Sequence, residues 1–155
     1  MKFPKVTGRS LNGVEVALPE AASGKVALII VAFVRQPPGV VDSWLAPFEN
    51  EFGSDPSYTV YEIPMLEGIW ARTISGIIDE GMRQGIPEKM HENVVSYYGN
   101  TELYCDVLEI KDKGLCYTFI LDKYGTIKWR SQGTVSTGEI QEMLRTAREL
   151  NKEWA

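Results

Sequence analysis

Two cysteines are the residues of this sequence with the chemistry for a covalent or redox reaction. Ten residues separate Cys105 from Cys116, and the stretch 111–114 between them can form a turn that brings the two together. A redox pair needs an exposed thiol whose ionised form is electrostatically favoured. Cysteine is also among the residue types most often buried, so both positions fit small apolar side chains beside a sheet. We favour packing and keep the redox pair as the alternative.

A single histidine, His91, is the other candidate for proton chemistry. It lies between Glu88 and Glu92 on a predicted helix, where it would accept a proton or contact a partner. A neutral, partly exposed histidine with a structural role fits the same pattern, and we favour that interpretation. One histidine and two cysteines do not make a zinc site or a multi-histidine centre within one subunit. We therefore expect no metal and no cofactor.

Tryptophan and arginine supply the candidates for protein contact. Trp44 and Trp70 fall at core positions of predicted helices, so packing is the simpler role for both. Trp129 and Arg130 lie on the returning strand of a predicted hairpin, and both residue types are enriched at interface hot spots. Arg35 directly follows an apolar strand and would hold an acidic group, although a solvated surface arginine fits equally simply.

A hairpin over residues 115–133 organises the elements that must position these side chains. Its first strand, CYTFIL, is apolar throughout, which is typical of a strand buried on both faces. The turn over 122–125 combines Asp with Gly, which is free to take positive φ. Residues 126–130 alternate, so one face of the returning strand is expected to meet the core and the other water or a partner.

The other predicted elements follow from hydrophobic periodicity and from the turn residues between the periodic segments. Asn12-Gly13 predicts a type I′ turn in a first hairpin, and the apolar run after Lys25 predicts a central strand covered on both faces. Ser136 and Glu139 predict a capping box. We expect helices over 41–52, 66–82, 87–98 and beyond Ser136, and a strand over 58–65; residues 101–110 fit either a short strand or a turn of helix.

Composition limits the classes of function. A chain of 155 residues with 44% hydrophobic residues predicts one globular domain over 1–155. The net charge of −5 argues against a general nucleic-acid or anionic-membrane binder, because both need a basic face. The longest apolar run is too short to span a membrane, and the N-terminus resembles neither a signal nor a transit peptide. We expect a soluble cytoplasmic protein, or a mature form that has lost its targeting segment.

The order of these elements resembles the thioredoxin-like fold, which implies an α/β three-layer sandwich: a mixed central sheet with an N-terminal β-hairpin and helices on both faces. The stretch PGVVDSWLAP is similar to the thioredoxin active-site helix, and alignment on Pro47 places Gly39 and Asp42 at the positions of the two redox cysteines. Cys116 stands near the position of the thioredoxin cis-proline. The resemblance therefore implies a redox site without its thiols or its proline.

Three segments together resemble the mitochondrial ATP-synthase assembly factor family of yeast-type chaperones: VDSWLAPF, IPEKMHE, and CYTFILDKYGTIKWRSQG followed by GEIQEML. This resemblance implies a thioredoxin-like fold and a role in assembly through protein contacts. If the resemblance extends to location, it implies the mitochondrion as the place of action, although no transit peptide is evident. The chain departs from the family pattern at Cys116-Tyr117, where the family has glycine and tyrosine.

Two functional hypotheses result. The first is a non-catalytic thioredoxin-like protein whose loop 35–44 and hairpin bind a protein partner, such as a subunit of a membrane complex. The binding candidates are Arg35, Gly39, Asp42, Trp44, His91, Trp129 and Arg130. The alternative is a thiol-disulfide or peroxide oxidoreductase that uses Cys105 and Cys116.

Overall fold

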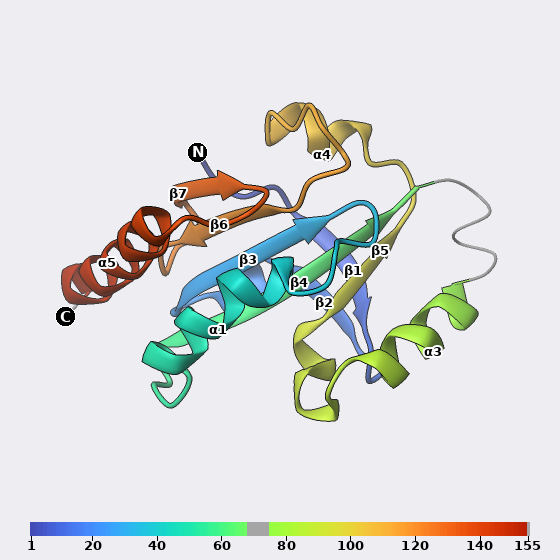
Figure 1. The fold of residues 1–155 in the computed structure, drawn as a ribbon, viewed down its shortest axis with the longest axis horizontal. Helices are drawn as coiled ribbons and strands as arrows, with labels where there is room; N and C mark the ends of the chain where they lie inside the picture. Colours follow the sequence, from blue (N-terminus) through green and yellow to red (C-terminus); the bar gives the residue numbers. More distant parts are fainter. Residues whose placement is uncertain (68–74, 155) are drawn as a thin grey trace.

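The computed structural model describes residues 1–67 and 75–154 (Figure 1). Its elements in chain order are β1 (Val6–Ser10), β2 (Glu15–Leu18), η1 (Glu20–Ala22), β3 (Val26–Ala32), α1 (Val40–Phe52), β4 (Tyr58–Leu66), α3 (Ser75–Gly85), η2 (Glu88–Asn93), β5 (Val95–Tyr98), α4 (Glu102–Val107), β6 (Tyr117–Leu121), β7 (Ile127–Gln132) and α5 (Thr137–Trp154). No helix among the described residues is both long and apolar enough to cross a membrane.

One mixed sheet of seven strands carries the fold, in the order β2-β1-β5-β4-β3-β6-β7. β3 is parallel to β4 and antiparallel to β6, and β6 and β7 form the predicted C-terminal hairpin. β4 is also parallel to β5, so the carboxyl ends of β3, β4 and β5 meet at one edge of the sheet. The mixed sheet with its N-terminal hairpin confirms the predicted thioredoxin-like class.

Two apolar clusters cover the two faces of the sheet. β3 is apolar throughout, and its alternate side chains enter opposite clusters, which confirms that it is buried on both faces. The α1-side cluster contains Val26, Leu28 and Ile30 with Trp44, Phe48, Cys116, Met143 and Ala147. The α4-side cluster contains Ala27, Ile29 and Val31 with Cys105, Leu108, Tyr117, Phe119 and Leu121. Helices thus pack on both faces, as predicted.

The first hairpin forms where Asn12-Gly13 predicted it, but its turn is of another type. Ser10 donates its N–H to the Val14 carbonyl, so three residues form the loop. Gly13 has a φ of 86°, whereas Asn12 is not among the residues with positive φ. A type I′ turn needs positive φ at both central residues, and the observed loop is the three-residue kind that places Gly in the left-handed region.

The segment between β4 and β6 differs most from the prediction. Leu66 ends β4 and does not begin a helix, and the helix that follows is described only from Ser75. The predicted helix over 87–98 is wrong: a short 3-10 helix ends at Asn93, and Tyr97 and Tyr98 lie in β5. Apolar residues spaced for one helical face also fit a strand inserted beside β4, and sequence periodicity over so few residues does not separate the two. Residues 101–110 form α4 and its exit. Trp70 lies outside the described residues.

α5 begins at the predicted capping box. The Ser136 hydroxyl accepts the Glu139 N–H at 3.2 Å and donates to the Glu139 carboxylate at 3.0 Å. Its inward face, with Met143, Ala147 and Leu150, packs into the α1-side cluster.

Candidate functional site

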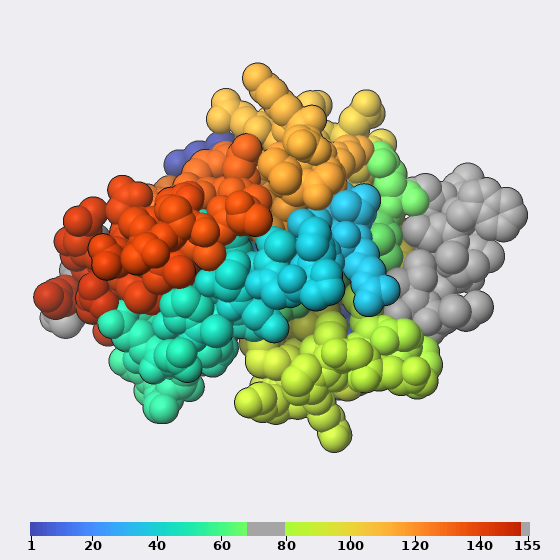
Figure 2. All heavy atoms as spheres, viewed as in Figure 1, coloured from blue at the N-terminus to red at the C-terminus, as the bar shows by residue number. Residues whose placement is uncertain are grey.

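The loop after β3 and the start of α1 lie at the carboxyl edge of the parallel strands. Gly39 stands just before α1 with a φ of 87°, and its carbonyl accepts the Ser43 N–H at 2.9 Å. Gln36 donates to the Gly114 carbonyl at 3.3 Å, which ties the loop to the segment before β6. Figure 2 shows this loop at the surface between α1 and that segment. Arg35, Gly39 and Asp42 are exposed there, so all three are accessible to a partner.

Trp44 connects α1 to the end of the C-terminal hairpin. Its ring is fully buried, and its Nε1–H donates to the Gly133 carbonyl at 2.9 Å. The ring also packs edge-on against Trp129, with 5.8 Å between centroids. Trp44 therefore positions the loop relative to the hairpin, and with its ring buried a direct contact between Trp44 and a partner stays a prediction.

Trp129 and Arg130 lie on opposite faces of β7. Leu121 is paired with Ile127 but Ile120 with Trp129, so Lys128 is the extra residue of a β-bulge. The bulge sends Ile127 to the α4-side cluster and the half-buried Trp129 to the α1-side cluster. The predicted simple alternation, with Ile127 and Trp129 on one face, is therefore wrong.

Arg130 lies on the α4-side face of the hairpin. Its guanidinium carbon is 5.0 Å from the centroid of the Phe119 ring, a cation–π distance. The side chain is half-buried, while Lys128 is exposed. The two basic groups therefore follow the outer strand of the hairpin, and Arg130 is held in place by an aromatic ring.

Glu62 is a functional candidate that the sequence analysis missed. It pairs in register with Ile30, so its side chain points to the α1 side of the sheet. Burial, and secondarily the negative charge of Asp42 in the first turn of α1, raise the pKa of this carboxyl from 4.5 to about 7. The available signal was a charged residue inside a strand, YTVYEIPM, that is covered on both faces.

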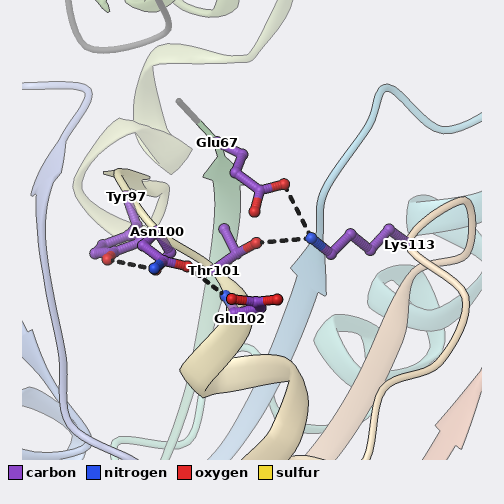
Figure 3. A network of polar contacts seen from close by, with 6 residues as sticks. All are labelled: Glu67, Tyr97, Asn100, Thr101, Glu102 and Lys113. Atoms are coloured by element: carbon purple, nitrogen blue, oxygen red, sulfur yellow. Dashed lines mark hydrogen bonds and ion pairs between the residues drawn. The ribbon is translucent and has the colours of Figure 1, made fainter. Parts of the chain in front are cut away.

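A polar network closes the same edge of the sheet (Figure 3). Lys113 Nζ lies 2.9 Å from a Glu67 carboxylate oxygen and 3.1 Å from the buried Thr101 hydroxyl. The hydrogen bond between Lys113 and Glu67 lowers the pKa of the Glu67 carboxyl and raises that of the Lys113 ammonium. Asn100 continues the network by accepting the Glu102 N–H at 2.9 Å. These contacts join the end of β4, the start of α4 and the segment before β6.

His91 has a structural partner. Its Nε2–H donates to the Ile86 carbonyl at 2.8 Å, and its own carbonyl accepts the Leu11 N–H at 3.0 Å. The residue thus connects η2 to the preceding turn and to the first hairpin. Neither of these hydrogen bonds joins His91 to Arg35, Trp129 or Arg130, which are other binding candidates.

The two cysteines are not brought together. Both are buried free thiols, and Cys105 belongs to the α4-side cluster whereas Cys116 belongs to the α1-side cluster. Burial raises the pKa of both thiols, which disfavours the reactive thiolate. Cys116 contacts the Gly133 carbonyl, which also accepts the Trp44 indole N–H. In the described part of the chain, no group of three or more potential metal ligands lies together.

Comparison with known proteins gives one family. A model of the ATP10 protein family matches residues 1–150. No curated protein matches the chain.

Solved structures with a similar fold are thioredoxin-like. The exposed lipoprotein thioredoxin Etrx1 of Streptococcus pneumoniae is 12% identical, with a TM-score of 0.61 over 94% of this chain and 99% of that one. The thioredoxin domain of a thiol-disulfide oxidoreductase of Bacteroides vulgatus is 18% identical, with a TM-score of 0.62 over 94% of each chain. BsSco, a member of the Sco family of cytochrome c oxidase assembly proteins, is 12% identical, with a TM-score of 0.63 over 97% and 94%. At these identities the likeness concerns the fold.

Proposed function

Because the chain belongs to the ATP10 protein family of ATP synthase assembly proteins, we propose that it is a non-catalytic assembly factor that acts by binding a protein partner. The observation that carries this proposal is the loop at the carboxyl edge of β3. Where the resemblance to thioredoxins places the redox cysteines, the chain has Gly39 and Asp42, which hold no thiol. The loop is nevertheless exposed and fixed to the rest of the fold.

The binding surface in this proposal combines the loop 35–39, the first turn of α1 and the C-terminal hairpin. Trp44 supports the combination, since its indole links α1 to Gly133 at the end of the hairpin. Arg35 and Asp42 would contribute exposed charges of opposite sign, and Arg130 a half-buried one. The partner we propose is a subunit of the membrane complex whose assembly the family serves.

The oxidoreductase alternative has less support. The similar folds include thiol-disulfide oxidoreductases, but this chain holds its two thiols in different apolar clusters on opposite faces of the sheet. A disulfide requires Cβ atoms about 4 Å apart, which a sheet between them does not allow.

Genetic complementation tests the proposal. A strain that lacks the gene should recover assembled ATP synthase, measured on native gels, when it receives the wild-type chain. A Cys105→Ala/Cys116→Ala variant that folds, as judged by circular dichroism, should restore assembly equally well because no thiol step is involved. Reduction of insulin disulfides at thioredoxin-like rates by the purified wild type would overturn the non-catalytic assignment.

The place of action is tested separately. We propose the mitochondrion, as in the family, with the cytoplasm as the alternative expected from the sequence. Cell fractionation with an antibody against the chain distinguishes the two.

A further inference from the structure

β7 ends the strand order of the sheet, and beyond residues 1–3 no further strand pairs with its outer side in the described part of the chain. Gly133 donates its N–H to the Cys116 carbonyl, which makes 133 and 116 a hydrogen-bonded pair of the β6–β7 ladder. Such pairs alternate along an antiparallel ladder, so the backbone N–H and C=O groups of Arg130 and Gln132 point away from β6. Among the described residues these groups have no hydrogen-bond partner.

The first part of the same edge already accepts extended backbone. Ile127 donates its N–H to the Met1 carbonyl at 2.8 Å, and Phe3 donates to the Gly125 carbonyl at 2.9 Å. Lys2 and Thr126 form an antiparallel bridge between these bonds. Figure 1 shows the N-terminus beside β7. The edge is therefore geometrically able to pair with a strand, and the pairing by residues 1–3 ends before Arg130.

The positive charges along this edge favour a partner strand with acidic side chains. Lys128 is exposed at the bulge, and Arg130 is held over the Phe119 ring, on a chain whose net charge is −5. The neighbouring acidic group, Glu139 of α5, is bound by the hydroxyls of Ser131 and Ser136. The opposite edge of the sheet, β2, begins instead with an exposed acidic residue, Glu15.

We propose that the outer edge of β7, at Arg130–Gln132, binds an extended acidic segment of a protein partner by strand addition. The partner backbone bonds to the outward groups of Arg130 and Gln132, and its carboxylates face Lys128 and Arg130. This inference rests on the proposed function, since it specifies how the partner is held.

A second copy of this chain fits the edge poorly. In a symmetric antiparallel pair of two β7 strands centred on Arg130, the two Arg130 side chains would lie opposite each other, and like charges across a strand pair destabilise it. A lysine at a bulge is a common protection of edge strands against such self-association. An acidic strand meets attraction at the same positions.

A peptide titration tests the inference on the full chain. The probe is a capped peptide of alternating Glu and Thr, about eight residues long, the length of an ordinary strand. Its addition should slow hydrogen exchange at the amides of Arg130 and Gln132, measured by NMR, and binding should weaken with added salt. Lys-Thr and backbone N-methylated versions of the peptide should produce neither effect.

Two variants identify the edge. Gln132→Pro removes an outward N–H but no bond to β6, so it should fold and lose the peptide. Lys128→Glu/Arg130→Glu should weaken binding about tenfold or more. The matched control Lys89→Glu/Arg9→Glu changes the net charge equally at exposed positions, in η2 and in β1, which is separated from β7 by four strands of the sheet, and should bind as wild type does.

The inference fails if the acidic peptide protects neither amide, if Gln132→Pro binds it unchanged, or if the amides are already protected by a concentration-dependent dimer.

Complementation separates this failure from that of the proposed function. If folded Gln132→Pro restores ATP synthase assembly fully, the edge inference is wrong while the assembly role stands. If the wild-type chain restores nothing, the assembly role itself is wrong.

Discussion

At the scale of single residues, the side chains that could take part in a reaction have other roles than their residue types suggest. The cysteines and His91 are held by packing and backbone contacts. Glu62 instead is a carboxyl placed where burial and Asp42 oppose its ionisation. Gly39 is a backbone position that no other residue type fits equally well, because its φ is 87°.

Glu62 should make the stability of the fold depend on pH. Its pKa is about 7 in the folded chain against 4.5 ordinarily, so the folded state binds this proton more tightly than the unfolded state. The free energy of unfolding therefore falls, by up to about 3 kcal/mol, as the pH rises between those two values. Glu62→Gln should be more stable than wild type at about pH 8, with the difference shrinking towards about pH 5. Urea denaturation at both values measures this. Glu142→Gln, at an exposed position, is the control, and parallel pH profiles for Glu62→Gln and wild type would contradict the assignment.

Gly39→Ala should destabilise the fold by about 1 kcal/mol or more, because a Cβ is disfavoured in the left-handed region. Nothing lies within 4 Å of the added Cβ, so the effect is one of backbone conformation alone. Gly138→Ala provides the matched control: it also has open space, but within helix α5, where alanine is favourable. Equal midpoints in urea for the two variants would show that the backbone at Gly39 is not strained by alanine.

At the scale of elements, the hairpin carries one inserted residue, Lys128. Ile127 and Trp129 are two positions apart and would share a face in a regular strand, but the bulge between them places them in opposite clusters. The bulge thus lets a short strand supply apolar groups to both clusters. It also leaves Lys128 on the outer edge.

Deletion of Lys128 would make Ile127 and Trp129 successive residues of a regular ladder, still opposite Leu121 and Ile120. The free energy of unfolding should therefore fall by less than about 2 kcal/mol, the value of one large apolar side chain removed from the core. Lys128→Ala keeps the residue count and should stay within about 0.5 kcal/mol of wild type. Chemical denaturation followed by tryptophan fluorescence compares the two. A loss of about 2 kcal/mol or more on deletion, but not in Lys128→Ala, would contradict this register.

At the scale of the whole molecule, the sheet separates what the sequence places close together. Cys105 and Cys116 are separated by only ten residues of the chain but lie in clusters on opposite faces of the sheet. Trp44 and Gly133, far apart in sequence, are in direct contact. The surface that we propose for partners combines the loop after β3 with the C-terminal hairpin, whereas both thiols lie in the buried clusters that cover the two faces of the sheet.

Neither thiol should react readily with a disulfide reagent in the folded protein, whereas both should react in denaturant, because burial raises the pKa of each. Colorimetric thiol titration measures this directly. Ser54→Cys, at an exposed turn, supplies a positive control for accessibility. An intramolecular disulfide formed on mild oxidation would contradict the placement of the cysteines on opposite faces.

The sequence by itself determines the elements whose burial leaves a local signature. β3 and β6 are predictable because a strand covered on both faces needs an uninterrupted apolar run, and α5 because its capping box and helical period agree. The resemblance of three segments likewise identifies the family. Each of these signals lies within one stretch of chain.

Only the tertiary structure decides which faces those elements share. The positions of Cys105 and Cys116, the burial of Glu62 beside Asp42, and the bulge at Lys128 all depend on strand register and on contacts between distant parts of the chain. The sequence predicts a helix where β5 lies, because the strands that pair with β5, β4 and β1, are remote in sequence. Pairing with distant strands overrides local periodicity, since a strand is stabilised by its neighbours in the sheet and much less by its own sequence.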